Sequence, residues 1–149
     1  MRAGLRAVLQ GGLLAGALDI LAAFLVYGLR GATPVRILQS IASGLLGAEA
    51  FEGGLATAAL GGLLHFFIAS GWAVVYYGAS RRLAVLLHRP VLSGMAYGAA
   101  VYLIMNLVVL PLSAVPKRPF AFDVVILIVH MFCVGLPIAL SVSRSAPKA

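Results

Sequence analysis

Four long apolar runs, separated by short polar segments, constrain what this chain of 149 residues can fold into. The runs lie at about residues 7–29, 53–78, 91–114 and 121–142. A helix of about 20 apolar residues crosses the hydrocarbon core of a bilayer, and each run is that long. Hydrophobic residues make up 62% of the chain and charged residues 10%, against about 45–50% and about 25% in soluble domains. The sequence predicts an all-α membrane protein, a four-transmembrane-helix bundle forming a single transmembrane domain over residues 1–149.

A shorter amphipathic segment, residues 34–46, lies in the first loop between the runs. Thr33 and Pro34 form a helix-start signal, with a hydroxyl that can cap and a proline at the first helical position. One side of the expected helix is apolar, and the other carries Arg36, Gln39, Ser40 and Ser43. Because 13 residues are too few to span a bilayer, the segment is predicted to be an interfacial or a re-entrant helix.

Lysine and arginine predict the orientation of the spans. The N-terminal segment, the connector at 79–90 and the tail carry Arg2, Arg6, Arg81, Arg82, Arg89, Arg144 and Lys148. The other two loops carry Arg30, Arg36, Lys117 and Arg118. Because cytoplasmic loops carry the excess of positive charge, both termini are expected in the cytoplasm. The net charge of +7 forms no basic stripe, so nucleic acid is not an expected partner.

Each of the four runs contains one strongly polar interior residue. These are Asp19, His65, Asn106 and His130. A charged side chain at mid-membrane costs about 2.5–3.5 kcal/mol on insertion scales, so such residues are functional candidates. At a rise of about 1.5 Å per residue, Asp19, His65 and His130 fall within about one helical turn of the same depth. Since lipid offers them no partners, the four side chains are expected to form one polar intramembrane cluster.

Three roles for this cluster remain open from the sequence. The polar side chains can hold the helices together by hydrogen bonds. A carboxylate beside imidazoles can instead pass protons, as in proton-linked transport or a proton relay. His65 and His130 can also ligate a haem iron or another metal ion, although no cofactor is required by any motif. No Gly-x-Ser-x-Gly, His-Glu-x-x-His or Walker-type loop occurs, so no catalytic residue is assigned and an enzyme is the least supported class.

Glycines recur at small-xxx-small spacing in the first and third runs, as Gly12 with Gly16 and Gly94 with Gly98. This spacing lets helix backbones approach closely, which predicts tight helix packing. A homo-oligomer, or a scaffold that binds other membrane proteins through these faces, is the alternative. Pro111 and Pro137 are expected to kink their helices. Trp72, near the end of the second run, fits an aromatic belt.

The opening Gly11-Gly12-Leu13-Leu14-Ala15-Gly16, the stretch from Asn106 to Pro111 and His130 resemble the YagU-like small bacterial inner-membrane proteins. The resemblance extends loosely over most of the chain. It implies a multi-pass protein of the bacterial inner (plasma) membrane and no particular activity. Asp19 has no clear counterpart in that pattern, and Asn106 stands where the pattern has a histidine.

Overall fold

The computed structural model describes residues 2–117 and 119–145, and no β-strand occurs among them. Four helical stretches are long enough and apolar enough to cross a membrane. They cover Gly4–Leu29, Gly54–Ser80, Pro90–Leu112 and Val124–Ser145, and we refer to them as the first to fourth spans. The prediction of an all-helical chain with four such helices is confirmed. Arg118 and Lys148, which entered the charge count, lie outside the described residues.

The helical elements follow one another with short connections. Their bounds are α1 (Arg2–Leu29), α2 (Pro34–Leu46), η1 (Gly47–Phe51), α3 (Gly54–Ser80), α4 (Val85–His88), α5 (Pro90–Ile104), η2 (Met105–Val109), α6 (Leu110–Leu112), α7 (Val124–Val129), η3 (His130–Gly135) and α8 (Leu136–Ser145). The third span is α5, η2 and α6, and the fourth is α7, η3 and α8. Helix α2 has the bounds expected from the sequence, and the Thr33 hydroxyl caps it by accepting from the N–H of Arg36.

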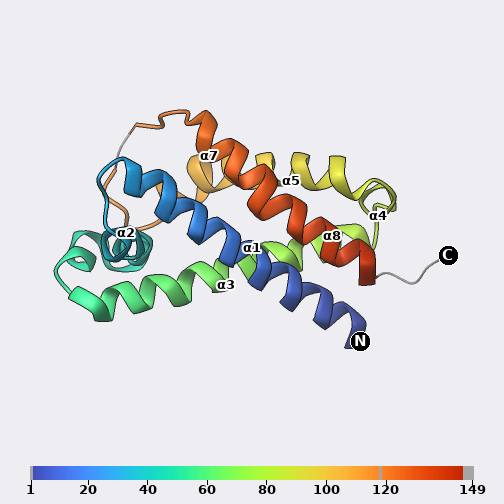
Figure 1. The fold of residues 1–149 in the computed structure, drawn as a ribbon, viewed down its shortest axis with the longest axis horizontal. Helices are drawn as coiled ribbons and strands as arrows, with labels where there is room; N and C mark the ends of the chain where they lie inside the picture. The colour runs from blue at the N-terminus through green and yellow to red at the C-terminus, as the bar shows by residue number, and fades with distance from the viewer. Residues whose placement is uncertain (1, 118, 146–149) are drawn as a thin grey trace.

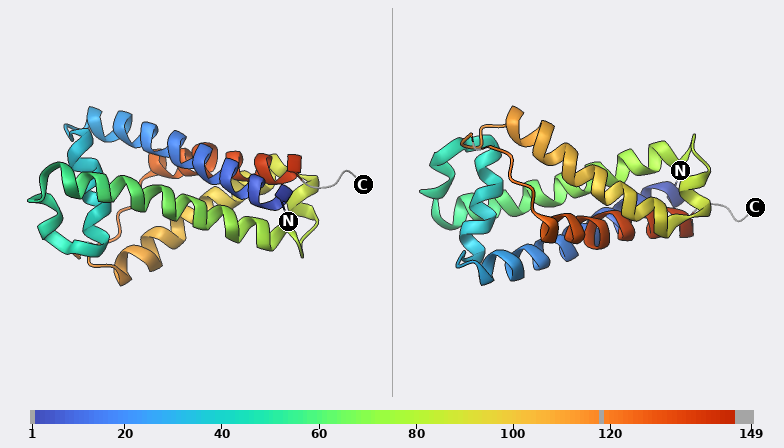
Figure 2. Two further views of the ribbon diagram at one scale, coloured as in Figure 1. Left: turned by 90° about the horizontal axis from the view of Figure 1, so that it is seen from below. Right: turned by 90° about the horizontal axis from the view of Figure 1, so that it is seen from above.

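The four spans lie side by side, and α2 runs across one end of them (Figure 1). α1 packs against α3 and α8, while α5 packs against η3 and α8. The start of α1 and the end of α8 lie at the same end as α4, opposite α2 (Figures 1 and 2). The spans lie closest together near α4 and diverge toward α2 (Figure 2). The two ends of the molecule are therefore packed differently.

Mostly small apolar side chains form the buried core in the closely packed part. The core consists of Ala7, Val8, Ala15, Ala73, Tyr76, Val101, Val134, Ile138, Ala139 and Val142. The outward-facing side chains are also apolar and large, for example Leu25, Leu63 and Phe67, which are 65%, 72% and 76% exposed. Exposed leucine and phenylalanine on so many helix faces are unusual for a protein in water and expected for one in lipid.

The glycines singled out in the sequence lie at contacts between spans of this chain. A side chain at Gly12 would meet the backbone of Ser70 on α3, and one at Gly16 would meet the ring of Phe66. Gly94 and Gly98 of α5 lie equally close to the backbone of the fourth span. These four positions are used for packing within the chain.

A π-helical segment precedes each of the two intramembrane prolines. Segment η2 ends two residues before Pro111, and η3 ends two residues before Pro137. Proline cannot donate the hydrogen bond to the carbonyl four residues earlier, and its ring crowds that carbonyl. A wider turn with bonds five residues apart, such as Leu110 N–H to the Met105 carbonyl, relieves this conflict. The chain thus accommodates Pro111 and Pro137, the two expected kink positions, with π-helical turns.

Helix α2 packs on α3 through backbone contact and buries part of its polar side. Gly61 of α3 lies against the carbonyl of Leu38, so the two helices approach very closely. Gln39 is buried, and its Nε2 donates to the carbonyl of Gly54 at 3.0 Å. The N–H of Ala114 donates to the carbonyl of Gly44 at 3.0 Å, which ties the far end of α2 to the third span. Part of the polar side expected for α2 therefore contacts the rest of the protein, and the other part is exposed.

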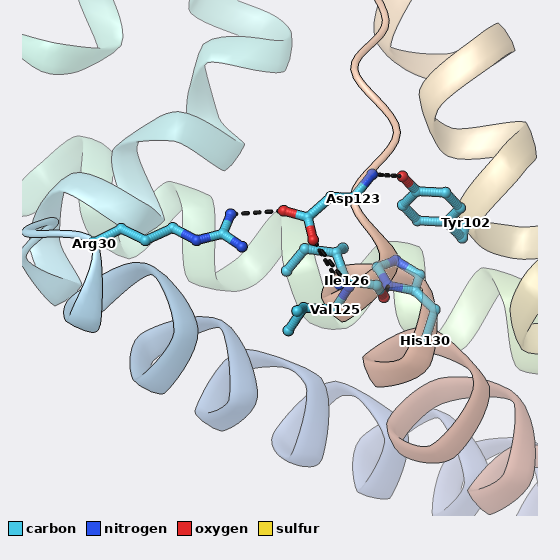
Figure 3. Close-up of polar contacts among 6 residues, drawn as sticks. All are labelled: Arg30, Tyr102, Asp123, Val125, Ile126 and His130. Carbon is cyan, nitrogen blue, oxygen red and sulfur yellow. Dashed lines mark hydrogen bonds and ion pairs between the residues drawn. The ribbon is translucent and has the colours of Figure 1, made fainter.

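An ion pair joins the end of α1 to the start of the fourth span (Figure 3). Arg30 Nη1 donates to Asp123 Oδ2 at 2.6 Å. The other carboxylate oxygen of Asp123 caps α7 by accepting from the N–H groups of Val125 and Ile126. The Asp123 N–H donates to the hydroxyl of Tyr102 at 2.8 Å. The bond from Arg30, together with the two backbone N–H donors, holds the pKa of the Asp123 carboxyl below its ordinary value of 3.8.

Asp123 is expected to make stability depend on pH in the acid range. A lowered native pKa means that the contribution is fully present above about pH 4 and disappears as the pH falls through the native pKa. Asp123→Asn keeps a capping side chain but not the charge, so its thermal midpoint in detergent should lie below that of the wild type at pH 6. The difference should shrink toward pH 3. Arg30→Gln should behave in the same way, and a difference that stays constant with pH would contradict this role of the ion pair.

Candidate functional site

A cavity of about 660 Å³ lies between the buried core and α2. All four spans and α2 contribute to its wall. The polar wall residues are Asp19, Tyr27, Arg36, Ser40, Ser43, His65, Trp72, Asn106, Ser113 and His130. Isoleucine, valine, alanine and methionine side chains form most of the rest. Arg36 and Ser40 are also exposed, so the cavity reaches the surface of the protein at the α2 end.

Asp19 on α1 and His65 on α3 form a carboxyl–imidazole pair in this cavity. His65 Nε2 lies 3.9 Å from Asp19 Oδ2, and the two side chains are 13% and 18% exposed. The same nitrogen lies 2.8 Å from the carbonyl oxygen of Gly16, one turn before Asp19. Since that carbonyl can only accept, the Nε2 atom carries the proton and donates it. Gly16 brings α3 close enough for this bond, because Phe66 packs directly on it.

Asn106 and His130 come from the two π-helical segments, one from each of the remaining spans. Asn106 Nδ2 donates to the carbonyl of Tyr102 at 2.9 Å. His130 Nδ1 donates to the carbonyl of Ile126 at 2.9 Å, and its ring packs edge-on against that of Tyr102 (Figure 3). π-helical turns inside α-helices are frequent at functional sites. Here each one carries the polar residue that its span contributes to the cavity.

All four predicted site residues therefore line one cavity, but they do not all contact one another. Asp19 and His65 lie side by side. Asn106 and His130 each bond a backbone carbonyl of their own span. A bundle held together only by mutual hydrogen bonds would have these side chains pointing at one another. Instead, most of their surroundings are apolar side chains and open cavity.

The two histidines keep one ring nitrogen each for a ligand. With Nε2 of His65 and Nδ1 of His130 donating to carbonyls, the lone pairs remain on Nδ1 of His65 and Nε2 of His130. Within residues 2–117 and 119–145, no group of three or more His, Cys, Asp or Glu side chains is placed to hold a metal ion. A metal ion or haem iron at this site would thus have at most two ligands from His, Cys, Asp and Glu side chains of these residues.

Several wall residues escaped the sequence analysis. Tyr27, Arg36 and Ser40 were not considered for the site, and Trp72 was assigned to an aromatic belt, yet all four line the cavity. The signal for Tyr27 was its spacing, because Ala23 and Tyr27 follow Asp19 at intervals of four and share its helix face. Trp72 follows His65 by seven residues, which is again the same face. Comparison with protein-family models, curated proteins and solved structures finds no match to this chain.

Proposed function

We propose that the protein is an integral membrane protein of the bacterial inner membrane and that its cavity is a proton-linked transport site. The four apolar helices and their exposed leucine and phenylalanine side chains support insertion in a bilayer. The excess of arginine at the end with the start of α1, the end of α8 and α4 supports a cytoplasmic location for that end. The α2 end then faces the periplasm.

Helix α2 is proposed to be re-entrant. It meets α3 at Gly61, which is seven residues after the start of α3 at Gly54. At about 1.5 Å per residue this places the crossing about 10 Å below the outer end of α3. Leu45 on α2 is 63% exposed, as expected for a side chain that meets lipid. A helix at this depth forms a cover over the cavity.

The observation that carries the proposal is the Asp19–His65 pair, 3.9 Å apart in a largely apolar cavity. A carboxylate and an imidazole are the side chains that exchange protons near neutral pH most readily when their surroundings change. Charged residues inside membrane spans mark ion and proton pathways. The pair is therefore suited to bind a proton and release it when a ligand or a conformational change alters its surroundings.

The packing of the other half of the molecule favours a carrier over a simple proton relay. Ala15, Ala73 and Tyr76 are fully buried between the cavity and the end with the termini. A relay needs a chain of polar groups across the membrane, and this core offers mainly alanine, valine and isoleucine. A cavity that is accessible from one side and closed on the other is what alternating access requires.

Proton binding can be tested with proteoliposomes on a solid-supported membrane. A pH jump should give a transient current from proton binding and no sustained current. Asp19→Asn should abolish the transient, and His65→Gln should reduce it. Glu52→Gln and His88→Gln make the same chemical changes at exposed residues outside the cavity, and they should leave the current unchanged. A wild-type current in Asp19→Asn would rule out Asp19 as the proton site, and a sustained wild-type current would favour a relay.

A further inference from the structure

We infer that the ligand of the cavity is a lipophilic monovalent cation that is held by the carboxylate of Asp19. The inference rests on the proposed function, because it names the substrate class of the same site. Among the described residues, Asp19 is the only acidic residue of the cavity wall. His65 Nε2 lies 3.9 Å from Asp19 Oδ2, beyond hydrogen-bonding distance, and donates to the carbonyl of Gly16 instead. The carboxylate oxygens therefore remain available to a cation.

Arg36 is not the cation that pairs with the Asp19 carboxylate. Its guanidinium lies 4.1 Å from the centre of the Phe51 ring, and the residue is exposed. This cation–π contact holds the arginine at the α2 end of the wall. Its charge there is screened by solvent far more than a charge in the cavity interior is. The guanidinium of the wall therefore lies at the opening, and the carboxyl group of Asp19 lies deeper.

The rest of the wall predicts a lipophilic ligand body. Large apolar side chains are contributed by Ile20, Ile37, Ile41, Ile68, Met105, Val109, Ile126 and Val129. Tyr27 and Trp72 add aromatic rings, whose faces attract cations. A volume of about 660 Å³ lies within the range of about 300–1,000 Å³ that is usual for small-molecule sites. An inorganic cation would leave most of this space and its apolar surface without a partner.

A second cavity supports access from the lipid. It measures about 290 Å³ and shares Asn106, Leu110, Val115 and Pro116 with the first. These four residues line both spaces, so the two cavities are neighbours. The outer wall includes Leu107 and Phe120, which are 54% and 46% exposed. Apart from Asn106 and Lys117 this wall is apolar, so we expect a ligand that dissolves in the bilayer to approach the central cavity along this side of the third span.

A proton and the cation compete for the Asp19 carboxylate, so binding of the cation displaces a proton wherever the carboxyl is protonated. The protonated carboxyl and the cation give the carboxylate–cation pair and a free proton, so charge is conserved. The other titratable or charged groups around Asp19 are His65, Tyr27, Cys133, His130 and Arg36. Protons compete with the cation for the carboxylate, so cation affinity should fall as the pH is lowered. This exchange couples the ligand to the proton gradient.

The test uses two probes of the same shape and opposite charge, tetraphenylphosphonium and tetraphenylborate. Binding to the purified protein is measured by equilibrium dialysis, with protein-free micelles as the blank. Wild type and Glu52→Gln should bind tetraphenylphosphonium and release a proton into unbuffered solution. Asp19→Asn should bind it at least about 30-fold more weakly, which is the scale for losing one partner of a desolvated charge pair. Arg36→Gln should bind it no more weakly than the wild type.

The outcomes separate this inference from the proposed function. Equal binding of both probes, or wild-type affinity for tetraphenylphosphonium in Asp19→Asn, overturns the cation site. If no binding occurs while the pH-jump current still depends on Asp19, the substrate class is wrong and the proposed function stands. If the cation binds through Asp19 without a proton-binding current, the cation site stands and the proton linkage fails. Should Asp19→Asn not fold, wild-type binding that is independent of pH overturns the inference.

Discussion

Gly98→Ala is expected to destabilise the protein by about 3 kcal/mol, at the upper end of the usual cost of overpacking. A methyl group at this position would overlap the carbonyl of His130 and crowd the Cα atom of Met131. Both are backbone atoms, so no side-chain rotation can relieve the overlap. The third and fourth spans would have to separate at the level of His130, where the cavity lies. The measurement is the apparent thermal midpoint in detergent, followed by circular dichroism.

Gly71→Ala is the matched control for this substitution. Gly71 lies in α3, and a Cβ added there would meet no atom within 4 Å among the described residues outside its chain neighbours and the backbone of its own helical turns. Because alanine favours a helix over glycine by about 0.8–1.0 kcal/mol, the midpoint of this variant should equal or exceed that of the wild type. If Gly98→Ala had the same midpoint as Gly71→Ala, the close contact between the third and fourth spans would be disproved.

The helices were predictable because lipid-spanning segments need length and apolar composition, and both can be read from the sequence. The ends were less certain for local reasons. The fourth span begins at Val124 rather than at 121, because Asp123 caps it. Helix α1 already begins at Arg2 rather than at Ala7. The π-helical turns before Pro111 and Pro137 were missed, since proline predicts a disturbed helix without specifying how the chain accommodates it.

The four site residues were predictable because a polar side chain inside an apolar run has few explanations. The depth of each of these residues along its helix could also be predicted, because the rise per residue is constant. The rotation of each helix about its axis could not be predicted. Each span carries apolar residues on all of its faces, so its sequence pattern does not show which face is turned inward. The contribution of α2 to the cavity was missed for a related reason, because its amphipathic pattern left an interfacial and a re-entrant helix open and did not show which residues face the spans. Arg36, Ile37, Ser40 and Ile41 of α2 line the cavity.

Cysteine accessibility tests most directly whether a cavity reaches the level of Asp19 from the α2 end. In a Cys133→Ala background, single cysteines replace Ala23 in the cavity wall, Ala22 beside it and Ala73 in the core. Intact cells are treated with a membrane-impermeant, cationic methanethiosulfonate. Ala23→Cys should be labelled, while Ala22→Cys and Ala73→Cys should not. Labelling of Ala73→Cys as fast as Ala23→Cys, or no labelling of Ala23→Cys from either side of the membrane, would contradict the cavity on which the proposed function depends.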